Sequence, residues 1–194
     1  MGDGPGSVDD RELLDGLRRG DGAVFDQLCL GYHDALWRFA FRIVRSREVA
    51  QDVVQDVFLN VWERRAELAI TTSLAAYLFS AVRRRALVYL RNDRTATRIA
   101  ATWGPGDVPA SGTVGESPLA EVEREEREAM VARALATLPP ARRQAVALRW
   151  GEHMEYEEIA EAMGISVEAA RAHVSRAYRT LRGLLRVMGV DPPV

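Results

Sequence analysis

The stretch that decides the fold spans residues 156–177 and reads YEEIAEAMGISVEAARAHVSRA. Ile159, Ala160 and Met163 share one face of a helix, at the spacing of a buried stripe. Gly164 then stands where a helix end favours a positive φ without the steric penalty of a Cβ atom. The stretch therefore predicts two helices joined by a tight turn.

The second helix of this pair carries the arginines. Ser166 is a favourable N-cap for it, and its apolar positions recur at helical spacing. These positions are Ala170, Val174, Ala177, Leu181 and Leu184. A helix-turn-helix with a basic second helix is the geometry that places side chains in a DNA major groove. The alternative is an ordinary pair of packed helices with a solvated basic face, and this stretch alone leaves it open.

Composition limits the other possibilities. The chain has 194 residues, of which 47% are hydrophobic, enough for one large or two small domains. No apolar run is long enough to cross a membrane, and Met1–Asp10 contains no signal segment, so we expect a cytoplasmic protein without membrane insertion. Cys29 is the only cysteine, which excludes an internal disulfide.

The sequence gives no support for catalysis. His33, His153 and His173 lack the spacing of metal ligands or of a catalytic triad, and no glycine-rich phosphate loop is present. We therefore expect that the protein is not an enzyme and uses no cofactor or metal.

Charge is segregated along the chain, although the formal net charge is only −2. Arginines dominate residues 73–98 and 166–188, whereas acidic residues gather in 48–67 and 121–128. This division indicates two basic surfaces for nucleic acid and a separate acidic surface for another partner. All 26 basic residues are arginine, a bias for which we favour a GC-rich genome as the explanation.

The chain divides into three parts by composition. Residues 10–98 carry long helical periodicities, which resume in residues 118–188. Between them, residues 99–117 are rich in glycine and proline, which predicts a flexible linker. No alternating segment of convincing length predicts a strand. The expected fold is therefore all-α, with two helical domains joined by a linker, and the second domain is a four-helix unit that contains the helix-turn-helix.

Individual helices are predicted in both domains. In the first domain one helix covers residues 25–43, a second runs from about residue 47 to residue 66, and Ser73 is the expected N-cap of a third. In the second domain Pro118 opens a helix that ends at Pro139, because a prolyl ring blocks its continuation.

Three segments in this order resemble a bacterial RNA polymerase sigma factor of the extracytoplasmic-function (ECF) group of the sigma-70 family. Residues 52–62 (DVVQDVFLNVW) resemble the helix that binds the β′ subunit of the polymerase. Residues 76–91 (AYLFSAVRRRALVYLR) resemble the helix that contacts the promoter −10 element. Residues 135–149 (LATLPPARRQAVALR) and the helix-turn-helix after them resemble the domain that recognises the −35 element.

The resemblance implies partners and contact residues for each domain. Residues 10–98 are similar to sigma region 2, which binds core RNA polymerase and the −10 element, and residues 118–188 to sigma region 4. Core polymerase, through its β′ and β subunits, is expected to meet the polar face of the second helix. That face consists of Glu48, Asp52, Gln55, Asp56 and Asn60. The alternative is an ordinary solvated acidic face.

Promoter DNA is the second partner that the resemblance implies. The expected −10 contacts are Thr71, Thr72, Ser73, Arg83, Arg84, Arg91 and Arg94. The expected −35 contacts are Ser166, Glu168, Ala169, Arg171, Ala172, His173, Ser175, Arg176 and Arg179. Aromatic side chains of the −10 helix could stack on exposed bases. We assign Tyr77 to the core, whereas the sequence leaves Phe79 and Tyr89 open.

Several positions depart from the family pattern. Arg84 and Val88 stand where Asn and Asp are usual in the −10 helix, and His173 stands where Arg is usual in the recognition helix. Alanines replace commoner Thr, Val and Ser at positions 169, 170 and 172. Glu155 replaces the customary Ser cap of the preceding helix. The family's promoter preference therefore does not transfer to this chain.

The sequence predicts a transcription initiation factor that binds core RNA polymerase, directs it to promoters with −35 and −10 elements and helps to melt the latter. An anti-sigma factor is a further partner that the family implies. One alternative is a helix-turn-helix regulator of response-regulator type, which would need a βα receiver domain. Another is a sigma-like decoy that only binds a regulatory protein.

Overall fold

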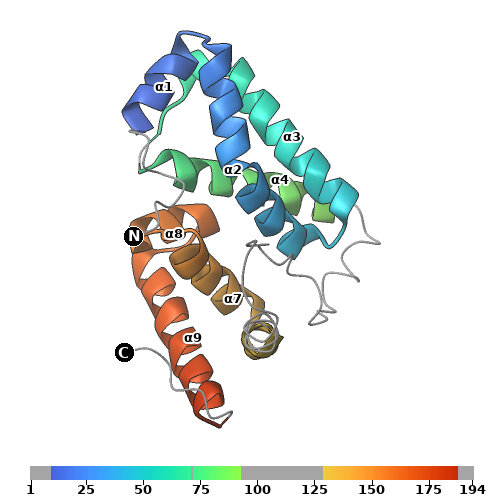
Figure 1. Cartoon of the computed structure of the whole chain (residues 1–194), viewed down its shortest axis with the longest axis vertical. Helices are drawn as coiled ribbons and strands as arrows, with labels where there is room; N and C mark the ends of the chain where they lie inside the picture. Colours follow the sequence, from blue (N-terminus) through green and yellow to red (C-terminus); the bar gives the residue numbers. More distant parts are fainter. Residues whose placement is uncertain (1–9, 71, 93–128, 188–194) are drawn as a thin grey trace, which may run out of the picture.

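The computed structural model describes residues 10–70, 72–92 and 129–187, and within these ranges it contains helices, turns and no strand. The expectation of an all-α fold is therefore confirmed. The predicted linker, residues 99–117, and the predicted helix start at Pro118 lie outside the described residues. Figure 1 shows the helices in two groups, α1 to α4 above and α7 to α9 below.

The first group begins with α1 (Asp10–Arg18), α2 (Gly22–Val44) and α3 (Arg47–Glu63). Asp21 caps α2, because its carboxylate accepts a hydrogen bond from the Ala23 backbone N–H at 3.0 Å. Ser46 caps α3 in the same way. The predicted helices over residues 25–43 and 47–66 correspond to α2 and α3, the latter ending in a short 3-10 turn at residues 65–67. Helix α1 was not predicted as a separate element.

Helix α4 (Leu74–Asn92) lies across α2 and α3 (Figure 1). Ser73 is its N-cap, as predicted, since its hydroxyl accepts a hydrogen bond from the Ala76 N–H at 3.1 Å. The Leu74 N–H donates to the Asp10 carboxylate at 3.0 Å, so the start of α4 is also tied to α1. Two independent contacts therefore determine where α4 begins.

Aromatic side chains fill the centre of this group. Phe39 of α2 and Phe79 of α4 are almost fully buried, and their rings meet edge to face with centroids 5.1 Å apart. Phe79 is therefore a core residue. Tyr77 is half-buried and packs against the core as predicted, and Tyr89 has the same intermediate exposure.

The second group starts with helical residues 129–136, followed by α7 (Pro140–Val146) and a π-helical turn, η2 (Ala147–Gly151). The break at Pro139 falls where the sequence predicted it. Arg143 bridges this break, because its Nη2 donates to the carbonyls of Ala136 and Leu138 at 2.8 and 2.6 Å. Burial, and secondarily the neighbouring Arg45, lowers the pKa of Arg143 to about 10.

The helix-turn-helix consists of α8 (Tyr156–Met163) and α9 (Val167–Val187). Gly164 ends α8 in the left-handed region at φ 61°, as predicted. Ser166 caps α9 through a hydrogen bond from the Ala169 N–H at 3.2 Å. The predicted apolar stripes of both helices are buried, apart from Leu184, which is half-buried. The cap of α8 is also satisfied, since the Glu155 N–H donates to the Glu158 carboxylate at 2.7 Å.

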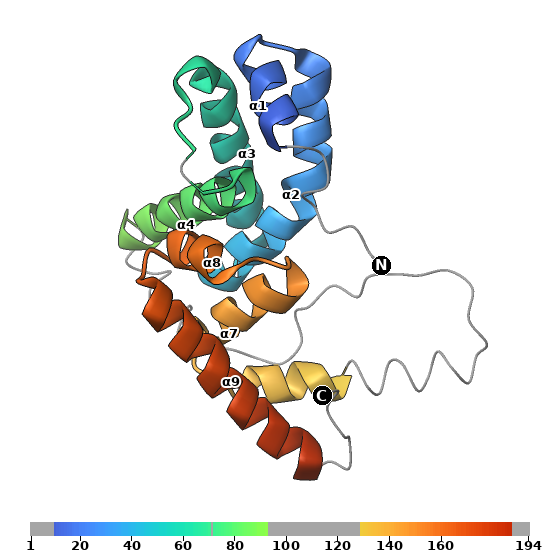
Figure 2. The ribbon, with the colours of Figure 1, turned by 90° about the vertical axis from the view of Figure 1, so that its left-hand side faces the viewer.

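The two groups of helices are not held apart. Both views place α4 directly against α8 (Figures 1 and 2). The largest cluster of buried apolar side chains contains residues of both groups, from Leu13 in α1 to Val174 in α9. A smaller cluster around Leu138 and Leu181 belongs to the second group alone. The two groups of helices, which correspond to the two helical domains expected from the sequence, therefore pack against each other within the described residues.

Candidate nucleic-acid interface

Helix α9 presents a polar face to solvent between residues 168 and 183. Ser175, Arg176 and Arg179 are exposed on it, as the sequence predicted for a recognition helix. Glu168 is exposed in the first turn, where a hydrogen bond from its own backbone N–H and then one from Ser166 lower its pKa. This face therefore begins with an ionised carboxylate and continues with guanidinium groups.

Arg171 differs from the other arginines of α9 because α8 engages it. Its Nη2 lies 3.7 Å from the Glu157 carboxylate, and its guanidinium stands 4.9 Å from the centre of the Tyr156 ring. These contacts orient Arg171 across the turn of the helix-turn-helix.

Three of the predicted −35 residues are less accessible than the others. Ala169, Ala172 and His173 are half-buried. The Nδ1 atom of His173 is fully buried and has no hydrogen-bond partner within the described residues. The side chains of the predicted −35 set thus separate into an exposed group and a packed group.

The predicted −10 residues that the structure describes fall into three classes. Thr71 and Arg94 lie outside the described residues. Thr72, Arg84 and Arg91 are exposed. Ser73 is occupied as the cap of α4.

Arg83 forms the third class, because it is half-buried at the junction with α8. Its Nη1 lies 3.4 Å from the point where a Cβ atom on Gly164 would stand. Gly164 follows the carboxyl end of α8, where the helix dipole favours a positive charge. The guanidinium of Arg83 is therefore directed at the second group of helices.

An exposed stripe runs along α3. Glu48, Asp52, Gln55 and Leu59 recur at helical spacing, and all four are exposed. We call this set the α3 stripe. Leu59 is 59% exposed, an unusual position for a large apolar side chain, and it was not among the predicted contact residues. Its spacing from Asp52 and Gln55 was the signal that could have identified it.

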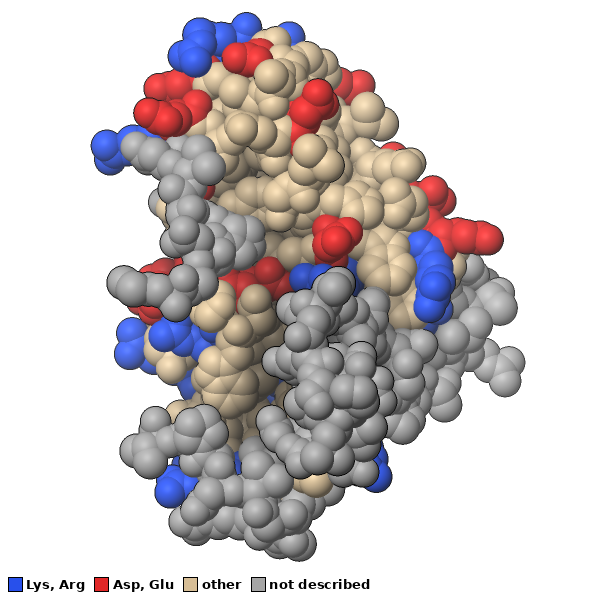
Figure 3. Space-filling view, in the orientation of Figure 1, with Lys and Arg blue, Asp and Glu red and all other residues tan. Residues whose placement is uncertain are grey.

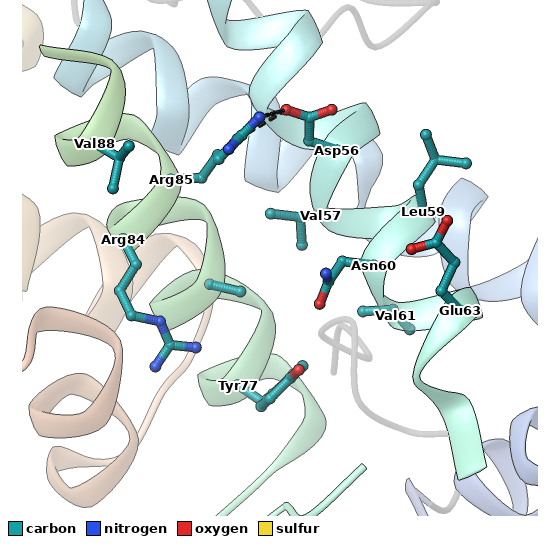
Figure 4. A pocket seen from close by; sticks show the side chains of 11 residues that line it. Asp56, Val57, Leu59, Asn60, Val61, Glu63, Tyr77, Arg84, Arg85 and Val88 are labelled. Atoms are coloured by element: carbon teal, nitrogen blue, oxygen red, sulfur yellow. Dashed lines mark hydrogen bonds and ion pairs between the residues drawn. The ribbon is translucent and has the colours of Figure 1, made fainter. Parts of the chain in front are cut away.

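Beside the stripe, α3 and α4 enclose an open groove of about 500 Å³ (Figure 4). Asn60 of α3 and Tyr77 of α4 lie on its opposite walls, and Arg84 of α4 also lines it. At one end the Arg85 Nε donates to the Asp56 carboxylate at 2.8 Å. Asp56 is therefore already paired within the chain, unlike Asp52. Arg85 was not among the residues predicted from the sequence, since its pairing joins residues of different helices.

The titratable groups of the described residues also include one thiol. Burial, assisted by Asp26, raises the pKa of the Cys29 thiol to about 11, so the thiol stays neutral at physiological pH. Among the residues that the structure describes, no cluster of His, Cys, Asp and Glu side chains could hold a metal ion. In the same part of the chain, no helix has the length and apolar character needed to span a bilayer.

Comparisons with known proteins agree with this geometry. Residues 28–95 match the family model described as sigma-70 region 2, and residues 128–181 match sigma-70, region 4. The RNA polymerase sigma-H factor of Pseudomonas aeruginosa is 30% identical in an alignment of 187 residues that covers 91% of this chain and 96% of that protein. The ECF RNA polymerase sigma factor SigL of Mycobacterium tuberculosis is 27% identical, over 91% of this chain and 97% of that protein.

Solved structures show the same fold. CnrH, in complex with the cytosolic domain of CnrY, is 25% identical and superimposes with a TM-score of 0.59 over 92% of this chain and 97% of that one. The sigma factor RpoE of Bartonella quintana, in complex with the anti-sigma factor NepR, gives a TM-score of 0.60 at 24% identity over 84% of this chain and 97% of that one.

Both halves of the chain thus match in the expected order, and the relatives are covered almost end to end. The chain belongs to the sigma-70 family, as a sigma factor of the ECF group that directs promoter-specific initiation of transcription.

Proposed function

We propose that the α3 stripe docks on core RNA polymerase while α4 and α9 contact the −10 and −35 elements of one promoter. The observation that carries this assignment is the separation of charge by helix. Glu48 and Asp52 are exposed acids on the α3 stripe. Exposed arginines line α4 at Arg84 and Arg91 and α9 at Arg176 and Arg179. A partner with a basic surface and a partner made of phosphates can therefore bind at the same time.

The stripe is suited to a protein partner because it combines charge with an apolar anchor. Asp52 offers an unpaired carboxylate within the described residues, and Leu59 offers apolar area that solvent would otherwise surround. Asn60 and the groove beside it extend this surface toward α4. Asp56 contributes less directly, since Arg85 neutralises it.

For the −35 element we assign the main role to Ser175, Arg176 and Arg179, which stand exposed on α9. Arg171 completes this set after exchanging its contact with Glu157 for one with DNA. Arginine is suited to contacts with bases and with the DNA backbone, because its planar guanidinium can form two hydrogen bonds with a guanine edge or with a phosphate. His173 is assigned to packing and not to base contact, because its Nδ1 is buried.

For the −10 element we assign Arg84 and Arg91, with Thr72 at the entrance to α4. The chain itself supplies binding energy and no bond chemistry, which belongs to the core enzyme. An anti-sigma factor is a proposed regulatory partner, and the cytoplasm is the proposed compartment. A receiver of response-regulator type is not compatible with helices α1 to α4, since it requires alternating strands and helices.

The assignment of α3 is tested by run-off transcription with purified core polymerase. Asp52→Arg should reduce promoter-dependent transcript at least tenfold, because it places a positive charge where a basic partner is expected to dock. Asp34→Arg is the matched control, since Asp34 is an exposed acid on α2 whose side chain is 86% exposed. Equal transcript from the two variants would remove the stripe from the polymerase interface. Absence of transcript from the unmodified chain would favour the decoy.

A further inference from the structure

The three consecutive arginines of α4 differ in their surroundings. Arg85 donates from its Nε to the Asp56 carboxylate at 2.8 Å. Arg83 is half-buried, with its Nη1 3.4 Å from the point where a Cβ atom on Gly164 would stand. Arg84, between them, is exposed and lines the groove between α3 and α4 (Figure 4). It has no ion-pair partner in the part of the chain that the structure describes, so its N–H donors are available to a ligand.

The groove differs from the surrounding surface because its two walls offer complementary hydrogen-bonding groups. In Figure 3 acidic and basic side chains are scattered over a largely uncharged surface in the upper part of the molecule. In the groove, the guanidinium of Arg84 belongs to the α4 wall, whereas the exposed amide of Asn60 and carboxylate of Glu63 belong to the α3 wall. A ligand between the walls therefore meets donors from one helix and acceptors from the other.

Apolar side chains lie between these polar groups. Val57 and Val61 of α3 are buried along the groove, and Ala81 and Val88 of α4 are half-buried. Tyr77, also half-buried, adds an aromatic ring. The volume of about 500 Å³ falls in the range of pockets that hold small organic molecules. The groove can therefore accommodate a flat ring with polar edges, such as a nucleobase.

Among the four DNA bases, guanine fits this arrangement best. Its N7 and O6 atoms are adjacent acceptors, to which one arginine can donate two hydrogen bonds. Its N1–H and N2–H groups are adjacent donors on the Watson–Crick edge, and one carboxylate can accept from both. Adenine presents a donor beside N7, so a guanidinium loses one of its two hydrogen bonds there. Arg84 and Glu63 are thus suited to the two polar edges of a single guanine.

We propose that the groove between α3 and α4 receives one unstacked guanine of the −10 region, with Arg84 bound to its O6 and N7 atoms and Glu63 bound to its N1–H and N2–H groups. A guanine presents both edges only after it has left its pair with cytosine, so the site favours the melted promoter. Arg84 stands where asparagine is usual in the family, so this base preference is particular to this chain. The assignment rests on the proposed function, which places −10 DNA along α4.

Base preference is measured with the reconstituted holoenzyme. Core polymerase and the full-length chain select duplexes from a library of randomised sequence, and the bound duplexes are sequenced. One position of the −10 region should show guanine enriched about tenfold over adenine. Arg84→Gln should reverse the preference at that position, because glutamine forms two hydrogen bonds with the N6 and N7 atoms of adenine.

Arg91→Gln is the matched control, because Arg91 is exposed about two turns further along the same face of α4 and is not among the residues that line the groove. It should weaken binding to all duplexes without changing the base preference, as the loss of a phosphate contact does. Glu63→Gln should reduce the preference for guanine about threefold, since an amide oxygen accepts beside an amide N–H that opposes the second donor. A purely structural role of Arg84 would not exchange guanine for adenine.

The free chain provides a second measurement that needs no polymerase. A dT oligonucleotide with one central dG should bind the full-length chain at least about threefold more tightly than the same oligonucleotide with dA, and Arg84→Gln should abolish this difference. If the holoenzyme selects promoters but Arg84→Gln leaves the base preference unchanged, the guanine site is overturned and the proposed function stands. If no promoter is selected, the proposed function fails, and equal binding of the dG and dA oligonucleotides would then overturn the guanine site as well.

Discussion

Helices α4 and α9 carry most of the exposed arginines assigned to DNA, yet they are anchored in different ways. Helix α4 buries large side chains such as Leu78, Phe79 and Val82, and it is covered by α2 and α3 on one side and by α8 on another. Helix α9 buries two alanines, Ala170 and Ala177, together with Val174 and Leu181, along a single face. One basic helix is therefore built into the core, and the other lies on the surface with its polar face open.

Because the two helices are anchored differently, the DNA contacts of α4 and α9 can be independent in function. A helix locked into a core presents its arginines with little freedom, which suits a site where bases must be removed from the stack at a cost of a few kcal/mol. A surface helix packed through alanines approaches its neighbour closely and leaves its outer face available to enter a groove.

The largest effect is expected in the core under α4. Phe79→Ala should lower the free energy of unfolding by about 3–5 kcal/mol, because it leaves a cavity beside Phe39. Val174→Ala on α9 should cost only about 1–2 kcal/mol, since it removes two methyl groups. Urea denaturation followed by circular dichroism measures both. Similar losses at the two sites would show that the helices are anchored alike.

The turn between α8 and α9 should show the next largest effect. Gly164→Ala is expected to cost about 1–2 kcal/mol, because residue 164 has a φ of 61° and an added Cβ would also meet Arg83. Gly183→Ala is the matched change within α9, where an added Cβ meets no atom within 4 Å. That change should stabilise the chain by about 0.5–1 kcal/mol. The opposite signs are checked by thermal unfolding, and equal signs would contradict the assigned conformations.

Residue patterns predicted the elements well wherever the signal was local. Gly164, Ser166 and Ser73 were identified as a helix end and two caps, because capping chemistry involves residues only a few positions apart. Helix α1 was missed as an element, although Leu13 and Leu17 are buried at helical spacing. The π-helical turn at 147–151 was also missed, since no residue pattern there differs from that of an α-helix.

Contacts between distant segments could not be predicted. The pairing of Asp56 with Arg85 and of Glu152 with Arg38 depends on how separate helices meet, which neither periodicity nor charge counting specifies. The glycine and proline content of residues 99–117 predicts a flexible linker, but it does not predict whether the two groups of helices pack against each other. Among the predicted partner contacts, Asp56 is paired with Arg85 and Arg83 lies against the end of α8, which the sequence alone did not predict.

The smallest effects are expected on α9, where two arginines differ in their surroundings. Arg176→Ala should weaken binding to a promoter −35 fragment about tenfold and lower the slope of log K against log salt by about one unit, if Arg176 contacts a phosphate. Arg171→Ala should change the affinity less than threefold, because forming a DNA contact first requires that Arg171 leave Glu157 and Tyr156.

Fluorescence anisotropy at several salt concentrations measures both variants against the same duplex. Glu157→Gln provides the control for this argument, since it releases Arg171 without removing it, and it should strengthen binding slightly. If Arg171→Ala proves the more damaging change, then the contacts across α8 and α9 position this arginine for DNA and do not withhold it. The DNA-binding face of α9 would then include Arg171, one turn before Ser175.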